Sequence, residues 1–325
     1  MMPIYVYADL TLSSTLTLAE LPISRGREAQ PPDLAIGELA FSPKSSDNEC
    51  IHCWQLHGSI PSVYLDKTNQ GFILRCADVA YFSISADGSR IGVWPAPSAS
   101  EETLRHLLLD QVLPRLFAHR GRVVLHAGAV RVDGRAIAFL GDTGSGKSTL
   151  AASFHGVGFP LLSDDGLVLS HAEGLTSALP TYPSLRLWPD SVSRLYKKRP
   201  PLEPMAHYSS KQRVAVGKAN DSVSNLMPLA AIYLLAPTAG TGPQKISISR
   251  LSPRDACVAM IGNSFQLDVT DTNRAAGLLT AAAQVARTVP TFRLGYPRDF
   301  DLLPSVRAAI LQTISVLAED PCSSP

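Results

Sequence analysis

A glycine-rich segment near the middle of the chain carries the clearest chemical signal. Residues 141–148 read GDTGSGKS, which matches the pattern G-x-x-x-x-G-K-[ST] at every fixed position. In such a loop the glycines let successive backbone N–H groups face a phosphate, the lysine reaches the β- and γ-phosphate oxygens, and the serine can ligate Mg²⁺. We therefore expect ATP to bind at Gly141, Asp142, Thr143, Gly144, Ser145, Gly146, Lys147, Ser148 and Thr149.

The context of this segment supports a phosphate loop over the alternative, an ordinary glycine-rich turn. A strand is predicted over residues 136–140, directly before the loop, and a helix is predicted from Lys147 to His155. A phosphate loop requires this strand-loop-helix order.

Two adjacent acids, Asp164 and Asp165, follow the apolar stretch 159–162. Paired carboxylates beside a phosphate loop can divide two tasks, because one can hold Mg²⁺ while the other takes the proton of an attacking hydroxyl. The sequence Asp-Asp-Gly is equally common as a turn, so the pair alone does not decide its role.

His126 closes a short apolar strand predicted over residues 123–125. A lone histidine in such a place is usually structural. However, a hairpin is predicted over 129–132 and 135–140, turning at Asp133-Gly134, and it would return the chain so that His126 lies near the phosphate loop. There an imidazole could orient a carboxylate and tune its pKa.

Together these features resemble the C-terminal catalytic domain of HPr kinase/phosphorylase and its relatives, phosphate-loop kinases akin in structure to phosphoenolpyruvate carboxykinase. His126 lies fifteen residues before Gly141, and Asp164 lies twenty-three residues after it, as in that family. The resemblance covers about residues 123–169. It implies that Asp164 is the catalytic base with His126 as its partner, that Lys147 acts on the phosphates, and that Asp165 and Ser148 hold Mg²⁺.

Other segments refine this resemblance. The G-R-N type signature that supports phosphorolysis in the bifunctional enzymes is not found after Asp165, which argues against phosphorylase activity. Residues 5–10, 185–189 and 292–300 resemble HPr-kinase-related proteins encoded with peptide-tailoring genes. These include the lasso-peptide kinases, which phosphorylate a serine at the C-terminus of a precursor peptide.

A basic segment follows the predicted site residues. Between Arg194 and Lys218 there are seven Lys and Arg residues against one acid, Glu203. This segment could be a lid that holds phosphates or an acidic peptide, or simply a solvated proline-rich loop, with 199–210 as its mobile part. Lys211 and Arg213 are the favoured substrate contacts, because they lead into the apolar stretch 214–216.

Composition limits the class of protein. The chain has 325 residues, of which 45% are hydrophobic and 18% charged, so we expect a globular protein. A net charge of +1 gives no field that would hold nucleic acid or a membrane surface. Residues 1–21 lack a secretion signal and the longest apolar stretch is too short to span a bilayer, so a cytoplasmic protein is expected.

The five cysteines are irregularly spaced, which argues against a disulfide framework. Cys50-Ile-His-Cys53, with His57 nearby, could be half of a zinc site. Zinc needs four ligands and no second ligand pair follows, so a reduced thiol pair is favoured.

Periodicity divides the chain into four parts. Residues 1–97 are predicted to form a smaller β-rich domain, and 98–120 a connecting helix kinked at Pro114. Residues 121–317 are predicted to form an α/β phosphate-loop kinase domain with a mixed sheet, and 318–325 a flexible tail.

The favoured function is an ATP- and Mg²⁺-dependent kinase that phosphorylates a hydroxyl, above all a serine of a peptide or small protein. A nucleotide-binding regulatory module without phosphotransfer and a kinase of sugars or nucleosides are the alternatives. His126 and Asp164 favour transfer, because binding alone needs only the loop. The sequence leaves the oligomeric state open, a homo-oligomer included.

Overall fold

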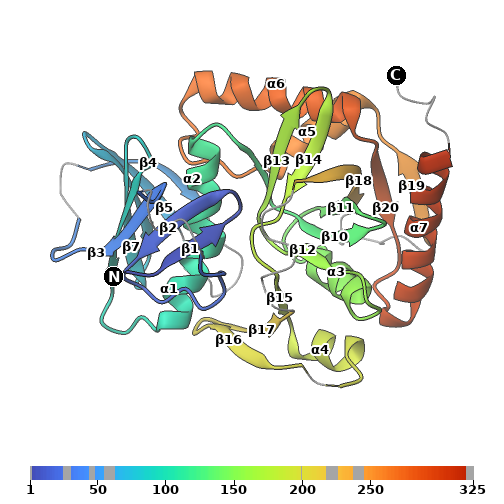
Figure 1. The fold of residues 1–325 in the computed structure, drawn as a ribbon, viewed down its shortest axis with the longest axis horizontal. Helices are drawn as coiled ribbons and strands as arrows, with labels where there is room; N and C mark the ends of the chain where they lie inside the picture. Colours follow the sequence, from blue (N-terminus) through green and yellow to red (C-terminus); the bar gives the residue numbers. More distant parts are fainter. Residues whose placement is uncertain are drawn as a thin grey trace.

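Three β-sheets and the helices that cover them organise the chain (Figure 1). The computed structural model describes residues 2–24, 31–43, 48–54, 63–198, 200–216, 226–236 and 245–319. Several of its strands run parallel and others antiparallel, so the expected mixed α/β class is confirmed at this level.

The first sheet contains the first eight strands, in the order β1-β2-β3-β8-β7-β6-β5-β4. Its strands alternate between the core and the surface. In β7, for example, Ala80, Phe82 and Ile84 are buried and the residues between them are partly exposed. The strands are β1 (Ile4–Tyr7), β2 (Leu10–Ser14), β3 (Leu34–Glu38), β4 (Glu49–Trp54), β5 (Val63–Thr68), β6 (Gly71–Cys76), β7 (Ala80–Ser85) and β8 (Arg90–Pro95).

A linker helix packs its apolar residues into the core of this sheet. It consists of α1 (Glu101–Leu107), the π-helical segment η1 (Leu108–Val112) and α2 (Leu113–His119). The irregularity expected at Pro114 takes the form of the π-helical segment directly before it. Proline has no N–H group to donate to the preceding turn, and a wider turn accommodates that missing bond.

The second sheet has β18 at its centre, bonded in parallel to β11 and β20 and antiparallel to β14. The predicted β10–β11 hairpin is confirmed, and φ is 46° at Asp133 and 75° at Gly134, as its tight turn requires. The strands are β9 (Val123–Leu125), β10 (Gly128–Val132), β11 (Arg135–Leu140), β12 (Leu161–Ser163), β13 (Leu167–Ala172), β14 (Leu175–Leu179), β18 (Met227–Leu235), β19 (Ser247–Arg250) and β20 (Thr291–Gly295).

Helices cover both faces of this sheet. The helices α3 (Lys147–His155) and α7 (Leu303–Glu319) share one hydrophobic cluster, while α5 (Pro253–Gly262) and α6 (Thr272–Thr288) share another (Figure 1). The residues of α3 match the predicted helix at both ends.

The third sheet lies where a mobile loop was expected, and that expectation is wrong. Its order is β15 (Ser184–Leu187), β17 (Ser209–Ala215) and β16 (Leu202–Ala206), and α4 (Pro189–Leu195) follows β15. Pro204 misled the sequence interpretation. It sits on the edge strand β16, where a missing N–H group is tolerated. Arg199 and Lys218 lie outside the described residues, as do residues 320–325 of the expected tail.

Within the described part of the chain, one helical stretch, Phe300–Glu319, is long and apolar enough by length and composition to cross a membrane. Its residues Leu303, Val306, Ile310 and Ile314 are buried in the cluster shared with α3. One face of this helix therefore belongs to the protein core.

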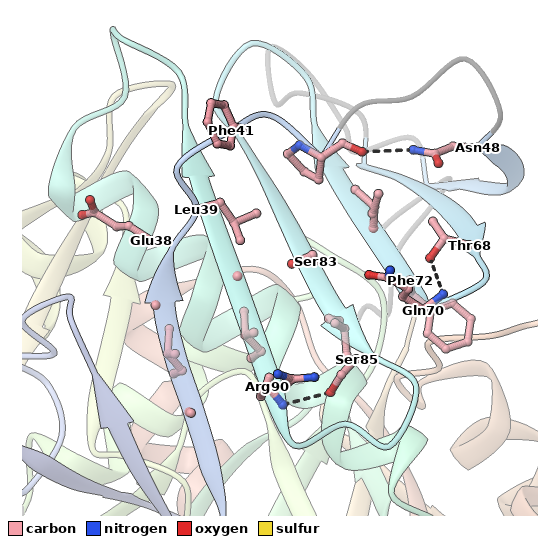
Figure 2. A pocket seen from close by; sticks show the side chains of 18 of the residues that line it. Glu38, Leu39, Phe41, Asn48, Thr68, Gln70, Phe72, Ser83, Ser85 and Arg90 are labelled. Carbon is pink, nitrogen blue, oxygen red and sulfur yellow. Dashed lines mark hydrogen bonds between the residues drawn. The ribbon is translucent and has the colours of Figure 1, made fainter.

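The outer face of the first sheet is hollowed (Figure 2). This hollow has a volume of about 1210 Å³, and Ser83, Ser85, Gln70 and Arg90 are among the residues lining it. Local hydrogen bonds occupy some of its polar groups, such as the 3.0 Å bond from the Arg90 N–H group to Ser85 Oγ. None of the site residues predicted from the sequence lies in it, so the chemistry must be sought elsewhere.

The β5–β6 turn gives a test of the first sheet. Gly71 has φ 139°, and a Cβ atom there would lie 2.0 Å from the backbone oxygen of Ile84. Because a strand carbonyl cannot move aside, Gly71→Ala should lower the free energy of unfolding by about 2 kcal/mol or more in a urea titration. Gly37→Ala is the matched control, since nothing lies within 4 Å of its Cβ position. Equal stability of the two variants would contradict the described turn.

Candidate active site

The phosphate-loop sequence connects β11 to α3. Gly141, Gly144 and Gly146 have φ values of 143°, 80° and 93°, a region that other residues enter at a cost. Gly146 caps α3 and no side chain bonds to the first N–H groups of the helix. Such groups, with the positive end of the helix dipole, form a site for an anion.

Lys147 is folded against the loop. Its Nζ donates to the backbone oxygens of Gly141, at 2.6 Å, and Asp142, at 3.1 Å. Burial lowers the pKa of Lys147, and no carboxylate among the described residues lies within ion-pair distance of Nζ. This cation is therefore available to a negatively charged ligand at the loop.

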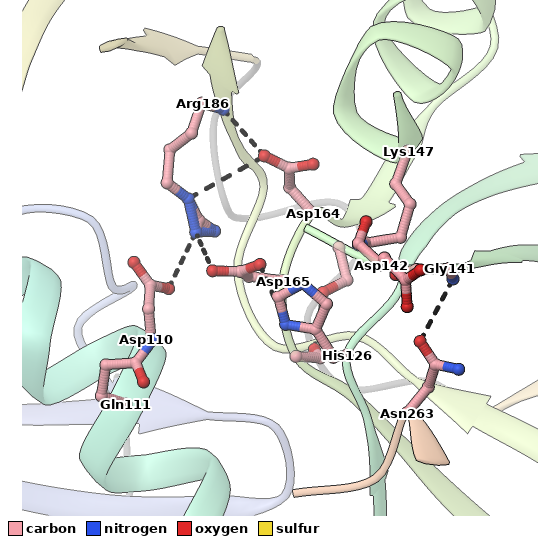
Figure 3. Close-up of polar contacts among 12 residues, drawn as sticks. Asp110, Gln111, His126, Gly141, Asp142, Lys147, Asp164, Asp165, Arg186 and Asn263 are labelled. Carbon is pink, nitrogen blue, oxygen red and sulfur yellow. Dashed lines mark hydrogen bonds and ion pairs between the residues drawn. The ribbon is translucent and has the colours of Figure 1, made fainter. Parts of the chain in front are cut away.

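Arg186, on β15, is the cation that joins the acids of the site (Figure 3). Its backbone N–H group donates to Asp164 Oδ2 at 2.8 Å. Its Nη1 lies 3.0 Å from Asp110 Oδ1 and 3.3 Å from Asp165 Oδ2. Although burial opposes its charge, Asp110, Asp165 and Asp164 raise the pKa of Arg186 well above its ordinary value. One buried guanidinium thus holds three carboxylates in place.

The two neighbouring aspartates differ in proton affinity. Burial raises the pKa of Asp164, although the charge of Arg186 and a contact with the Ser148 hydroxyl oppose the rise. Burial also opposes the charge of Asp165, but nearby positive charge, above all that of Arg186, outweighs it and lowers the pKa of Asp165. At neutral pH, Asp165 is therefore firmly ionised and Asp164 is the stronger proton acceptor.

His126 contacts Asp165, so the expected pairing of His126 with Asp164 is wrong. Its Nδ1 lies 3.4 Å from Asp165 Oδ1 (Figure 3). Its ring centroid lies 5.7 Å from that of Phe265. The two aspartates lie in the bend that follows β12, and Asp165 is the one that contacts His126. Burial lowers the pKa of His126 to about 4, so at neutral pH it meets Asp165 as an uncharged imidazole.

A cleft of about 300 Å³ brings most of the predicted residues together. Those that line it are His126, Thr143, Gly144, Gly146, Lys147, Ser148, Thr149, Asp164, Asp165 and Lys211. The remaining loop residues support it from behind. The Gly141 N–H group donates to Asn263 Oδ1 at 3.2 Å, Asp142 bonds to Lys147 through its carbonyl, and Ser145 is buried.

The two predicted substrate contacts separate. Lys211 lines the cleft, and its Nζ lies 5.4 Å from the ring centroid of Trp188. Arg213 is buried and pairs with Glu20, which also accepts from Arg105 Nε at 3.0 Å. The charge of Arg213 is thus neutralised inside the molecule, and its expected role as a substrate contact is wrong.

Two residues of the site, Asp110 and Arg186, were not predicted from the sequence. Asp110 comes from η1, accepts from the Tyr182 hydroxyl, and its Oδ2 lies 2.7 Å from Nδ1 of His106. The available signal was an acid inside the apolar run 107–113, four residues after a histidine. For Arg186 no local pattern exists, because all its partners come from other elements.

Only part of the candidate zinc site lies in the described residues. Cys50 and Cys53 are exposed free thiols on β4, and His57 lies outside the described residues. Across the described ranges, no group of three or more His, Cys, Asp or Glu side chains could hold a metal ion. A Mg²⁺ ion bound together with phosphates needs fewer protein ligands than that, because it usually keeps several waters.

Comparison with known proteins adds little to this geometry. No family model and no curated protein matches the chain. A solved structure described as the Hpr(Ser) kinase/phosphatase from Coxiella burnetii matches with a TM-score of 0.29 and 13% sequence identity. The match covers 58% of this chain and 97% of that one. The likeness is too weak to assign a function, and the site must be judged on its own residues.

The network around Arg186 predicts a graded loss of stability. Asp110→Asn removes the negative charge that faces the buried Arg186 and replaces one of the two acceptor oxygens with an NH2 group, so we expect it to lower the free energy of unfolding by about 3 kcal/mol. Tyr182→Phe removes a single hydrogen bond and should cost about 1 kcal/mol. Urea titration of both variants measures the difference, and an Asp110→Asn protein as stable as the wild type would refute the buried network.

Proposed function

We propose that the protein is a kinase that uses ATP and Mg²⁺ to phosphorylate a serine hydroxyl of a peptide or small protein. The carrying observation is one cleft that combines a phosphate loop with two aspartates of opposite proton affinity. The likeness of residues 185–189 and 292–300 to lasso-peptide kinases suggests the C-terminal serine of a precursor peptide as an acceptor. The free thiols of Cys50, Cys53, Cys76 and Cys257 fit the reducing cytoplasm, where ATP is plentiful.

ATP binding would use the loop and Lys147. The N–H groups at the start of α3 would donate to phosphate oxygens. Nζ of Lys147 would exchange its hydrogen bonds to the Gly141 and Asp142 carbonyls for bonds to phosphate oxygens. The same cation then stabilises the negative charge that develops on the leaving ADP oxygen.

Ser148 and Asp165 fit a Mg²⁺ site. Both line the cleft, both offer the hard oxygen ligands that Mg²⁺ prefers, and the Asp165 side chain, 21% exposed, is held ionised. When bound, Mg²⁺ supplies positive charge to the phosphates. The uncharged His126 ring would orient Asp165, so His126 would support Mg²⁺ binding and not proton transfer.

Asp164 would accept the proton. As the acceptor oxygen bonds to the γ-phosphorus, its proton passes to Asp164 Oδ1 and the bond from that phosphorus to the β,γ-bridging oxygen breaks, releasing ADP. The Arg186 N–H group holds Oδ2, while Oδ1 is buried without a partner at hydrogen-bond distance and would receive the proton. Simple nucleotide binding would have no use for such an acceptor, which favours transfer over a purely regulatory module.

Removal of the loop cation tests the nucleotide site. Lys147→Ala should weaken ATP binding about 10- to 100-fold in isothermal titration, because a charge-assisted contact to phosphate is lost. The exposed Lys197→Ala is the matched control and should bind ATP normally. Unchanged affinity in Lys147→Ala would rule out the phosphate-loop assignment.

Separate substitutions of the two acids test the division of labour. Asp164→Asn should bind ATP but lower kcat for transfer of labelled γ-phosphate to a serine peptide by about 10²- to 10⁴-fold. Asp165→Asn should instead raise the Mg²⁺ concentration needed for half-maximal rate. If both variants shifted the Mg²⁺ requirement alike, these roles would be wrong.

The pH dependence follows from the same residue. Asp164 accepts a proton only when it is ionised, and burial raises its pKa. As the pH is lowered, wild-type turnover should therefore begin to fall at a higher pH than the one at which an ordinary aspartate becomes protonated. Since the folded pKa is raised, the charge of Asp164 also reduces stability above that pKa. Asp164→Asn should therefore not lower Tm, which separates loss of activity from loss of fold.

A further inference from the structure

The linker helix forms one wall of the catalytic cleft. It contributes His106, Leu107, Gln111 and Arg115 to the lining, whereas the phosphate-binding groups come from the loop and α3. Arg115 takes no part in the proposed phosphate, metal or proton chemistry, yet it is a charged residue that is only 5% exposed.

Arg115 differs from the other buried arginines because it has no acidic partner. Among the described residues, Arg186 and Arg213 are the other two arginines of the core, and both are paired with carboxylates. Arg115 donates only to neutral groups of Gln111, its backbone oxygen at 2.8 Å and Oε1 at 3.0 Å. Its Nε is buried without any partner. A buried charge without an oppositely charged partner lowers the stability of the fold unless a ligand supplies that partner.

Aromatic rings hold the guanidinium in place. Its Cζ lies 4.4 Å from the ring centroid of Trp54, on β4, and 5.3 Å from that of Phe265. With Gln111 fixing Nη1, the planar guanidinium is rigid before any ligand arrives, which leaves its Nη2 group to donate to a carboxylate. Burial lowers the pKa of Arg115 only to about 10, so it stays charged at neutral pH.

The position of Arg115 relates it to the acceptor. Phe265 contacts both the guanidinium and the His126 ring, so this cation stands one aromatic ring away from the His126–Asp165 pair. Lys147 and the start of α3 already serve the phosphates. An anion that meets Arg115 is thus best supplied by the molecule that carries the acceptor hydroxyl.

We propose that Arg115 binds a carboxylate of the acceptor that lies within about one residue of the hydroxyl to be phosphorylated. This inference rests on the proposed kinase function. The C-terminus of a peptide ending in serine and an acidic side chain beside an internal serine present the same chemistry, and the experiment below distinguishes them. Arg115 then sets acceptor specificity and leaves ATP binding to the loop.

The test uses the full chain and three peptides of otherwise equal sequence: one ending in serine with a free carboxylate, the same peptide as a C-terminal amide, and the amide with glutamate beside the serine. With the wild-type protein, the KM should be about 10- to 100-fold lower than that of the plain amide for the peptide with a free C-terminal carboxylate, for the glutamate peptide, or for both. In Arg115→Gln this preference should vanish while KM for ATP stays unchanged. Arg115→Lys should restore it only in part, and the exposed Arg254→Gln is the matched control.

Two results would overturn the proposal. One is equal use of all three peptides by wild type. The other is an Arg115→Gln variant with weakened ATP binding and intact peptide preference, which would make Arg115 a phosphate ligand.

Peptide binding measured by calorimetry with a non-hydrolysable ATP analogue keeps the two proposals separable. A carboxylate preference that depends on Arg115 would support the site even if no peptide were phosphorylated, and only the kinase assignment would then fail. Absence of any preference in binding would overturn the site, whatever the kinase assay showed.

Discussion

The buried guanidinium of Arg186 is the interaction on which the rest of the site depends. It faces Asp110 from the linker helix and both Asp164 and Asp165 from the segment after β12. Without this cation three closely spaced carboxylates would repel one another, and protonation of at least one of them would be favoured. With it, one aspartate can remain firmly charged while its neighbour keeps an elevated pKa, so a single cation gives two adjacent acids different chemistry.

The same constraint explains why the N-terminal sheet and the linker helix belong to the functional unit. The helix buries its apolar residues in the core of that sheet, and η1 turns Asp110 toward Arg186. Trp54 of β4 stacks on Arg115 at the cleft. Substitutions far from the phosphate loop can therefore alter the site through these packed contacts. The hollow on the outer face of the sheet (Figure 2) is lined by none of the residues named here.

Local patterns made part of this arrangement predictable. The phosphate loop, α3 and the β10–β11 turn depend on glycines and neighbours within a few residues, and the structure agrees with the sequence there. The contacts of Arg186 with its acidic partners join residues 21 or more positions apart, so no spacing rule predicts them. The roles expected of His126 and Arg213 failed for the same reason, because Asp165 and Glu20 are tertiary partners. Pro204 concealed a strand because an edge position, which the sequence does not reveal, makes proline acceptable.

Carboxyl carbon-13 NMR titration of the full-length protein measures the proton affinities of Asp164 and Asp165 separately. Asp164→Asn and Asp165→Asn would assign the two signals. We expect the Asp165 carboxyl to stay ionised at pH values below the ordinary pKa of aspartate. We expect the Asp164 carboxyl to take up its proton at pH values above that pKa. Titration of both groups at an ordinary aspartate pKa, or in the reverse order, would contradict this expectation.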